Sequence, residues 1–545
     1  MNRQLCSALA TLALTASAAG PSPEAKAWWS HVQYLASDKL GGRNAGSPGH
    51  KVAVDYVAAQ FSKAGLSPCG DAGTFLQRVP LVNKRLIETE SGLTAVMGSG
   101  QTRTIALGEE AILSTRVELP DMVDAPVEFL GYGLSIPGSY DDFAGRSVRD
   151  KLVIVISGSP ASLPGPIRAH FSSAAERVKA LTAAGALGIL TISNPKTDDV
   201  PWDRTSATRL MPSMSIDDPV LSGGGTPLLS ASLNAAKSEW LFEGAPQPLA
   251  SLLELATAGQ PLPRFPLNGI TIRARAKVEK KRLDSQNVCG MLPGSQPGES
   301  VVLSAHIDHL GTDPNATGAD KIYNGAMDNA SGIATLIETA RAMSKAGGKS
   351  GARPPRRSIL FVAVTAEEKG LLGSRFFANR APAAAGTMVA NINMDMFLPI
   401  HAMKKIMAFG LEESSLRTHL EAVTARLGLG LQSDVEPHRN RFIRSDQYSF
   451  IQRGIPALAL KVGYEPGSPE AELQKQWTAQ RYHARSDDLL QPVDFETAAA
   501  FNRVVRELAM AVADAPSRPT WNESSFFRRF ALPQAGVASS GGGRQ

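Results

Sequence analysis

The sequence predicts an α/β protein in which helices flank a mixed, mostly parallel sheet and a β-rich domain is inserted into the chain. Two observations lead to this prediction. From about residue 284, apolar runs of strand length alternate with helical patterns, which is typical of a mostly parallel sheet covered on both faces. Between about residues 110 and 275, short apolar runs are instead broken by glycine and proline, as expected of a β-rich unit.

The first residues have the pattern of a secretory signal peptide. Arg3 gives a positive start, residues 5–16 are apolar and small, and Ala16-Ser17-Ala18 fits the small-x-small cleavage pattern. An ordinary buried helix is the alternative. No later segment offers about 18 uninterrupted apolar residues, the minimum for a membrane span. We therefore expect residues 1–18 to be removed, and the mature protein to be secreted or periplasmic without membrane attachment.

Residues 19–110 are expected to begin the main domain. A helical stretch leads into a loop rich in glycine and proline at residues 41–49. Apolar side chains then recur at helical spacing as far as Ala64, and Gly65 is a natural end for this helix.

Residues 111–275 are expected to form the β-rich unit, with a core of its own. Strands are predicted at residues 127–133, 152–157 and 188–192, and a helix runs from Ala174 to Ala184 before Gly185.

Residues 276–515 are expected to contain most of the main sheet. The apolar runs that predict buried strands are residues 301–305, 359–365, 389–394 and 457–462. The helical patterns between and after them are residues 333–345, 371–379, 416–427 and 501–512. Functional side chains of such sheets gather beyond the carboxyl ends of the strands, so the polar residues there are the candidates for a site. Residues 516–545 contain too few apolar side chains for a core and are expected to form a flexible tail.

Composition argues against several kinds of function. The 56 basic and 51 acidic residues give a formal net charge of only +5. No long basic run is interleaved with aromatic residues, so we expect no nucleic-acid binding. Loss of Cys6 with the signal peptide leaves Cys69 and Cys289, whose pairing the sequence does not determine. With so few cysteines, thiolates are not expected to bind metal.

His306 and Asp308 directly follow the apolar run at residues 301–305. Because side chains alternate along a strand, these two residues are expected on the same side. A metal-bound imidazole needs its second nitrogen held, and a carboxylate two residues away can do this. A hydrogen-bonded pair without metal is the alternative.

Three further carboxylates lie in loops beside predicted strands and helices. Asp328 stands before a helix, where it either caps free backbone amides or bridges two cations. Glu367 and Glu368 are adjacent at a strand end and repel each other unless a positive charge lies nearby. Adjacent side chains point in different directions, so one can bind metal while the other faces the reacting water. A solvated helix start is the alternative.

Asp395 and His483 complete the set. Asp395 lies between Met394 and Met396, and a buried carboxylate needs a partner, either a metal or a basic side chain. His483 alone is equally compatible with a structural role. The order of these residues along the chain favours a metal centre. Oxygen and nitrogen ligands without thiolate suit zinc, with manganese or cobalt as substitutes.

The order and wording of these motifs resemble the M28 family of zinc peptidases, of the aminopeptidase Y and S type, over nearly the whole chain. Residues 31–65 resemble the family's leader, and residues 127–133 and 185–188 resemble its protease-associated domain, which we place at residues 111–275.

The resemblance implies two zinc ions and assigns the metal ligands as His306, Asp328, Glu368, Asp395 and His483. One ion would have His306, Asp328 and Asp395, and the other would have Asp328, Glu368 and His483. The resemblance also implies that Glu367 is the general base and that Asp308 holds His306.

The chain departs from the family pattern at two positions. Met327 stands where a second acid is often found, and Ala366 stands where glycine is common, which we expect to be harmless. The motifs fix no tyrosine as oxyanion stabiliser, and Tyr448 and Tyr464 are candidates. Asp446 lies in a stretch that resembles the family's substrate-side loop and is a candidate for the peptide's amino group.

The implied function is removal of N-terminal residues from peptides with a free N-terminus, by metal-activated water. A carboxypeptidase, a dipeptidase or another amide hydrolase with the same metals stays open, because the motifs do not define the pocket walls. A binding protein that has lost catalysis would lack a ligand or the base, and all six positions are filled. The sequence does not predict the oligomeric state.

Overall fold

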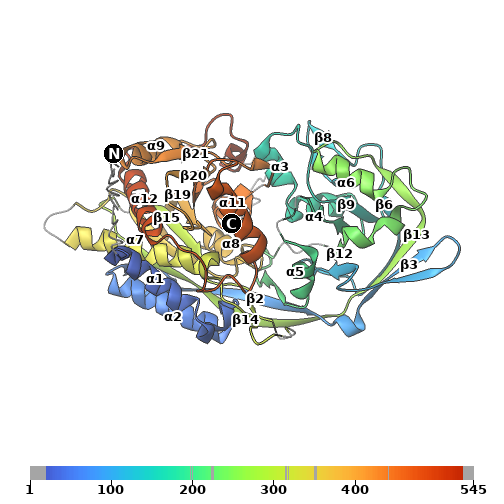
Figure 1. Cartoon of the computed structure of the whole chain (residues 1–545), viewed down its shortest axis with the longest axis horizontal. Helices are drawn as coiled ribbons and strands as arrows, with labels where there is room; N and C mark the ends of the chain where they lie inside the picture. Colours follow the sequence, from blue (N-terminus) through green and yellow to red (C-terminus); the bar gives the residue numbers. More distant parts are fainter. Residues whose placement is uncertain are drawn as a thin grey trace, which may run out of the picture.

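The computed structural model describes residues 20–531, apart from residues 197, 199, 223–225, 297, 314, 315, 317, 349–352 and 440. The predicted signal peptide at residues 1–18 and residues 532–545 of the predicted tail lie outside the described residues. Figure 1 shows two lobes side by side, one with the main sheet and most of the helices and one rich in strands. The α/β class with an added β-rich domain is confirmed.

The main sheet has four parallel strands at its centre. In spatial order they are β18 (Ser358–Val364), β15 (Glu299–His306), β19 (Thr387–Met394) and β22 (Ala457–Val462). Each coincides with one of the four predicted apolar runs, because strands buried on both faces are apolar throughout.

Other strands extend the main sheet on both sides. Beyond β18 lie β14 (Val278–Leu292), β2 (Leu76–Leu86) and β11 (Ser213–Ile216), all antiparallel to their neighbours, and β1 (Ser67–Pro68) pairs with β14. Beyond β22 lie β20 (Lys405–Phe409), antiparallel to it, and β21 (Gly430–Gln432).

Helices cover both faces of the main sheet. The first face packs against α1 (Pro23–Leu35), α2 (Pro48–Lys63), α7 (Ser331–Gly348), α9 (Leu416–Arg426) and α12 (Phe495–Asp514). The second face packs against α8 (Leu372–Asn379) and α10 (Gln447–Ile451). Successive residues of β18 alternate between the two cores: Ile359 and Phe361 belong to the first, and Leu360 and Val362 to the second.

Local signals set the bounds of α2. The Ser47 hydroxyl accepts a hydrogen bond from the N–H of His50, and Pro48 occupies the first turn, as is common at helix starts. Gly65 adopts φ 81° just beyond the helix, the left-handed conformation that commonly ends one.

The β-rich lobe has its own sheet and its own core. The strand order is β4 (Thr102–Ile105), β3 (Gly92–Met97), β13 (Phe265–Arg275), β6 (Met122–Phe129), β9 (Leu152–Ile156), β10 (Gly188–Ile192), β12 (Leu229–Leu233) and β5 (Ala111–Leu113). Its helices include α3 (Gly165–Phe171), α4 (Ala174–Ala183), α5 (Trp202–Ala207) and α6 (Leu249–Thr257). A buried cluster around Phe129, Ile154 and Leu229 forms this core.

The boundary predicted at residue 111 needs correction. β3 and β4 already belong to the sheet of the β-rich lobe, so the chain enters that lobe before residue 92. In the opposite sense, β11 comes from within the predicted insert but pairs with β2 of the main sheet. The local glycine and proline pattern does not reveal these pairings, because they join segments that are distant in sequence.

The tail predicted as flexible is packed as far as it is described. Trp521 and Phe527 are buried beside Phe442, and the indole N–H of Trp521 donates to the carbonyl of Gly454 at 2.8 Å. Two large aromatic side chains anchor a segment whose average apolar content is low. The prediction of flexibility was therefore wrong for residues 516–531.

Cys69 and Cys289 form a disulfide, which answers a question that the sequence left open. Both residues are fully buried, and the bond ties the segment at β1 to β14. A bond that closes a long loop typically stabilises a protein by about 2–4 kcal/mol.

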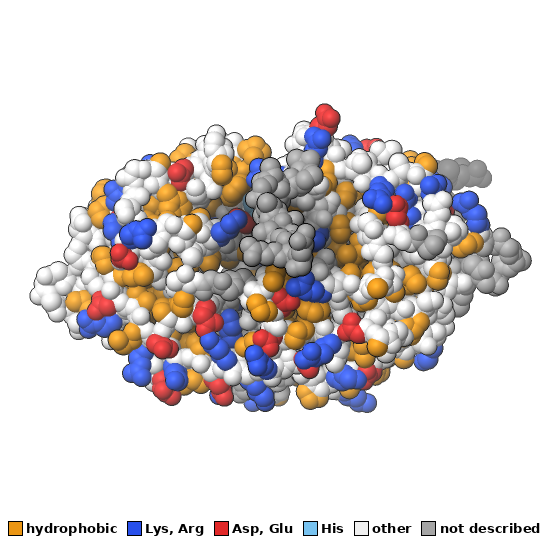
Figure 2. Space-filling model, turned by 180° about the vertical axis from the view of Figure 1, so that it is seen from behind, with side chains coloured by type: hydrophobic (Ala, Val, Ile, Leu, Met, Phe, Trp, Pro, Cys, Tyr) orange, Lys and Arg blue, Asp and Glu red, His pale blue; other side chains and the backbone are white. Residues whose placement is uncertain are grey.

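Acidic and basic side chains are interspersed on the face of the molecule drawn in Figure 2, which agrees with the small charge excess of the chain. Among the described residues, none of the helices combines the length and hydrophobicity that a bilayer crossing requires.

Candidate metal centre

Polar side chains gather beyond the carboxyl ends of three neighbouring strands. His306 is the last residue of β15, Asp395 directly follows β19, and Glu367 and Glu368 follow β18 after a short turn. Because β18, β15 and β19 are adjacent and parallel, their carboxyl ends lie at one edge of the sheet.

Two further residues reach the same place from outside the sheet. Asp328 lies in the turn Ala326–Ala330 that leads into α7. His483 follows α11 (Pro469–Arg481). The structure thus brings together all five of the residues that the sequence suggested as ligands.

The first group of possible ligands is His306, Asp328 and Asp395. The Nε2 atom of His306 lies 3.2 Å from Oδ1 of Asp328 and 3.4 Å from Oδ1 of Asp395. Burial lowers the pKa of His306, but Glu367, Asp328 and Asp395 outweigh this effect and raise the pKa well above its ordinary value.

The second group shares Asp328. The Nε2 atom of His483 lies 3.1 Å from Oε2 of Glu368 and 3.5 Å from Oδ2 of Asp328. Asp328 therefore presents Oδ1 to the first group and Oδ2 to the second, the arrangement expected of a bridging carboxylate.

His309 also belongs to the second group, and the sequence reasoning missed it. Its ligand atom lies with those of Asp328 and Glu368 within 4.8 Å of one another. The imidazole is fully buried, and Nδ1 lies 2.8 Å from Oε1 of Glu368. His309 stands three residues after His306, but the alternation that paired His306 with Asp308 ends with β15. The sequence analysis applied strand alternation only to His306 and Asp308 and made no prediction for His309.

Metal ions fit this arrangement of atoms. Both ring nitrogens of His309 and Oε1 of Glu368 are buried without a hydrogen bond of acceptable geometry to the described residues, although Nδ1 and Oε1 are close together. A cation can satisfy buried nitrogen and oxygen atoms that converge in this way. The donors are imidazoles and carboxylates without thiolate, a set that suits zinc.

Glu367 and Glu368 face different surroundings. Glu367 lines a cavity of about 600 Å³ that also exposes Asp328, Asp395 and His483. Burial, opposed mainly by His306, raises the pKa of Glu367 well above its ordinary value. Burial also raises the pKa of Glu368, but His483 and His309 outweigh it and hold that pKa well below the ordinary value.

Asp308 makes a different contact from the one predicted. Nδ1 of His306 lies 3.2 Å from the backbone carbonyl of Asp308 and 4.0 Å from its carboxylate. The carboxylate instead accepts the backbone N–H of Glu367 at 3.1 Å. Burial raises the pKa of Asp308 to about 6. Asp308 thus holds His306 mainly through its carbonyl and holds the Glu367 loop through its side chain.

The candidate for the peptide's amino group and the two candidate oxyanion stabilisers lie in different places. Asp446 is fully buried and absent from the described cavity lining, which contains its neighbours Ser445 and Gln447. The Tyr448 hydroxyl is 2.7 Å from Nδ1 of His170 in the β-rich lobe, whereas Tyr464 lines the cavity. Of the two tyrosines considered, Tyr464 is the one beside the site.

Ala366 has a conformation that matters for the Glu367 loop. Its φ of 54° lies in the left-handed region that favours glycine. We expected alanine to be harmless at this position, but the sequence did not reveal that it would adopt a conformation that glycine adopts with less strain.

Residues 287–509 match the family model of Peptidase family M28. This segment is an M28 peptidase domain. The leupeptin-inactivating enzyme 1 of Streptomyces exfoliatus is 29% identical to the chain over 210 residues, which cover 37% of the chain and 43% of that protein. The probable leucine aminopeptidase 2 of Aspergillus fumigatus is 26% identical over 276 residues, or 48% of the chain and 50% of that protein.

The chain spans about half the length of these curated relatives. A solved aminopeptidase from Aneurinibacillus sp. strain AM-1 shares the fold more widely: the match covers 91% of this chain and 95% of that one, with a TM-score of 0.54 at 20% identity. The M28 domain and its aminopeptidase fold are thus confirmed.

Two residues that the sequence reasoning did not single out hold the loops of the M28 domain. The carboxylate of Asp487 accepts the backbone N–H groups of Met327 and Asp328, both at 2.9 Å. The buried guanidinium of Arg43 donates to the backbone carbonyls of Ile307 and Gly325, each at 3.0 Å. Asp487 follows His483 closely, and Arg43 lies in the glycine-rich loop of the leader.

The β-rich lobe also supports the M28 site. Arg116 donates to the backbone carbonyl of Glu368 at 3.2 Å. Arg204 of α5 donates to the carbonyls of Ala479 and Tyr482 at the end of α11, just before His483. Two arginines of this lobe therefore contact segments that carry candidate metal ligands.

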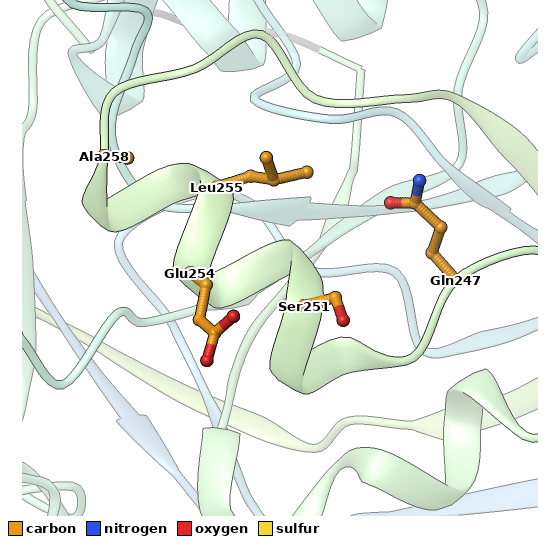
Figure 3. Close-up of a pocket in the computed structure, with 5 residues that line it drawn as sticks. All are labelled: Gln247, Ser251, Glu254, Leu255 and Ala258. Carbon is orange, nitrogen blue, oxygen red and sulfur yellow. The ribbon is translucent and has the colours of Figure 1, made fainter.

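A second depression lies on α6, far from these residues in the fold. It is lined by Gln247, Ser251, Glu254, Leu255 and Ala258. Figure 3 shows Ser251, Glu254 and Leu255 on the helix, Ala258 at its end and Gln247 on the loop before it, and these side chains do not converge on one point. One carboxylate among neutral side chains gives no basis for a metal or catalytic site there.

Proposed function

We propose that this protein is a secreted aminopeptidase that uses two zinc ions to hydrolyse N-terminal residues from peptides. The observation that carries the proposal is the double use of Asp328, whose two oxygens face two different groups of ligands. A carboxylate shared in this way suits a pair of cations. The names of the relatives, a probable leucine aminopeptidase and an aminopeptidase, support the same class of reaction.

In this proposal the residues divide into two ligand sets. His306, Asp328 and Asp395 hold one ion, and Asp328, Glu368 and His483 hold the other. His309 adds a nitrogen donor beside Glu368. When bound, two such ions supply a Lewis acid for the scissile carbonyl and a water of lowered pKa.

Glu367 is proposed as the general base. Its carboxylate faces the cavity, so it can accept a proton from water and later pass that proton to the leaving amine. The hydrogen bond from its backbone N–H to Asp308 fixes the loop that carries it. A base held on a fixed loop loses less free energy to reorientation during the reaction.

The disulfide supports secretion. A bond between Cys69 and Cys289 persists in oxidising compartments and is rare in the cytosol. Together with the signal-peptide pattern of residues 1–18, this favours a secreted or periplasmic protein.

The full chain can be tested with leucine p-nitroanilide, with the N-acetylated substrate as the matched control. We expect close to two zinc ions per chain by elemental analysis, hydrolysis of the free substrate only, and loss of activity on chelation. Cleavage of the acetylated substrate at an equal rate would argue against an aminopeptidase. Full activity with one ion or none would refute the dinuclear site.

A further inference from the structure

The cavity beside the metal centre has an apolar floor with one ammonium group set into it. β20 and β22 pair so that Met407 lies opposite Lys461 and Phe409 opposite Ala459, and all four side chains line the cavity. Residues two apart on a strand share a face. The rigid sheet, rather than a loop, therefore directs Lys461 to the cavity.

Among the described residues, Lys461 has one hydrogen-bond acceptor and the attraction of the nearby carboxylate of Asp395. Its Nζ donates to the backbone carbonyl of Met396 at 3.1 Å and lies 5.9 Å from the ring centre of Phe409. An ammonium group has three donors, and among the described residues the Met396 carbonyl is its one hydrogen-bond acceptor. Donors of this group therefore remain for a ligand in the cavity.

Away from the candidate metal ligands and Glu367, basic side chains outnumber acidic ones in the walls of the cavity. Apart from the metal-site acids, the described residues that line it include five basic side chains against the two acidic ones, Asp198 and Glu436. The basic residues are Arg439, Arg441, Arg444, Lys461 and Lys475. Glu436 is shared, with one oxygen 2.8 Å from Arg439 and the other 2.8 Å from Arg441. Glu436 thus pairs with both guanidinium groups, and Arg441 also bonds to the side chain of Tyr464.

We propose that this cavity selects peptides that present a carboxylate close to the scissile bond, with Lys461 and Arg441 as the residues that recognise it. The inference rests on the proposed function, since the metal centre would hold the peptide bond while the cavity holds the carboxylate. Charge-assisted hydrogen bonds from Lys and Arg to carboxylate are the strong ones among side-chain contacts. An apolar side chain in the same place would cover the ammonium group without pairing it, which costs free energy.

Two sources supply such a carboxylate. One is the side chain of an N-terminal glutamate or aspartate, whose methylene groups would lie on Met407 and Phe409. The other is the terminal carboxylate of a dipeptide. The test separates them with one pair of substrates for each: Glu- against Gln-p-nitroanilide for the side chain, and Leu-Leu against Leu-Leu-amide for the terminus.

We expect kcat/KM of the unmodified protein to favour the charged substrate of at least one pair by tenfold or more. We expect Lys461→Met and Arg441→Gln each to reduce this preference by at least fivefold. Lys461→Arg should restore much of it. The control is Lys404→Met, an exposed lysine outside the described cavity lining, which should leave the preference unchanged. Zinc content is measured for every variant, because Lys461 lies near Asp395.

Equal kcat/KM within both pairs would overturn the inference while leaving the proposed aminopeptidase intact. A protein that hydrolyses none of the four substrates would instead refute the proposed function. A binding measurement then decides the inference separately: zinc-loaded Glu367→Gln protein should bind glutamate α-amide or free Leu-Leu at least tenfold more tightly than the neutral counterpart. Equal binding, or none, would overturn it.

Discussion

The adjacent residues Glu367 and Glu368 show how one peptide step separates two chemical roles. Glu367 lines the cavity, whereas Oε1 and Oε2 of Glu368 lie near His309 and His483. The pKa of Glu367 is raised because burial outweighs the attraction of His306, and that of Glu368 is lowered because His483 and His309 outweigh burial. The left-handed conformation of Ala366 begins the turn that sets this divergence.

Conservative substitutions should separate the two glutamates. Glu367→Gln keeps size and hydrogen bonding but cannot accept a proton, so we expect turnover to fall by at least ~10²-fold with zinc still bound. Glu368→Gln removes a charged ligand, so zinc affinity should fall and excess zinc should restore part of the activity. Turnover and zinc content of both variants are the measurements. Near-normal turnover of Glu367→Gln would refute the assigned base, and equal zinc loss in both would mean that the roles are confused.

His309 offers a second test at the same scale. If its imidazole is a donor for the second ion, His309→Asn should weaken binding of the more weakly held zinc by about 10-fold or more, the usual scale for such partners. Competition with a chromophoric chelator measures this without relying on activity. His401→Asn, a buried histidine outside both ligand groups, is the control. Unchanged zinc affinity in His309→Asn would assign the residue a packing role.

At the scale of elements, the strands were predictable and the long-range pairings were not. The run at residues 359–365 predicted β18 to within one residue at each end, because a strand buried on both faces is apolar throughout. The candidate ligands that follow these strands were predicted from the same argument. β3 could not be assigned to the second sheet, because its partner β13 lies more than a hundred residues further along the chain. β4 joins this sheet only by pairing with β3. His309 was missed because strand alternation was applied only to His306 and Asp308.

The turn that carries Asp328 depends on one carboxylate from a distant loop. Asp487→Asn would leave at most one good acceptor for the N–H groups of Met327 and Asp328, so the bridging carboxylate should be less well fixed. We expect zinc affinity to fall about 10–100-fold, the range for residues that position metal ligands, with the far-UV circular dichroism unchanged. The matched control is Asp488→Asn, because the carboxylate of Asp488 accepts a backbone hydrogen bond from Leu490 and from neither Met327 nor Asp328. If both variants bind zinc alike, Asp487 does not position the site.

On the scale of the whole molecule, both lobes contribute contacts to the candidate site. The cores are separate, yet Arg116 and Arg204 of the β-rich lobe donate to backbone carbonyls beside Glu368 and His483. Asp198 of the same lobe lines the cavity. Docking of the lobes therefore affects the geometry of the candidate metal ligands as well as access to them.

One contact between the lobes should make stability depend on pH. His170 of α3 lies beside the hydroxyl of Tyr448 and packs against Phe526 and Phe530. Burial is the main cause that lowers its pKa, Arg529 and Lys179 lower it further, and Glu176 opposes them. An unfolded histidine, with a pKa of about 6.5, then takes up a proton more readily than the folded one. The contribution of His170 to stability is thus complete above about pH 6.5 and is lost as pH falls through the folded pKa.

The substitution His170→Gln tests this, because glutamine can bond to Tyr448 but does not titrate. Between pH 7.5 and 5.5 the free energy of unfolding of the unmodified protein should fall more steeply than that of the variant, by up to about 1.4 kcal/mol per pH unit for one proton. Urea unfolding at pH 7.5, 6.5 and 5.5 measures the difference. Tyr448→Phe keeps the histidine and loses its hydrogen bond, so it should lower stability at all three values and retain the slope. Parallel pH profiles for His170→Gln and the unmodified protein would show that this contact does not sense pH.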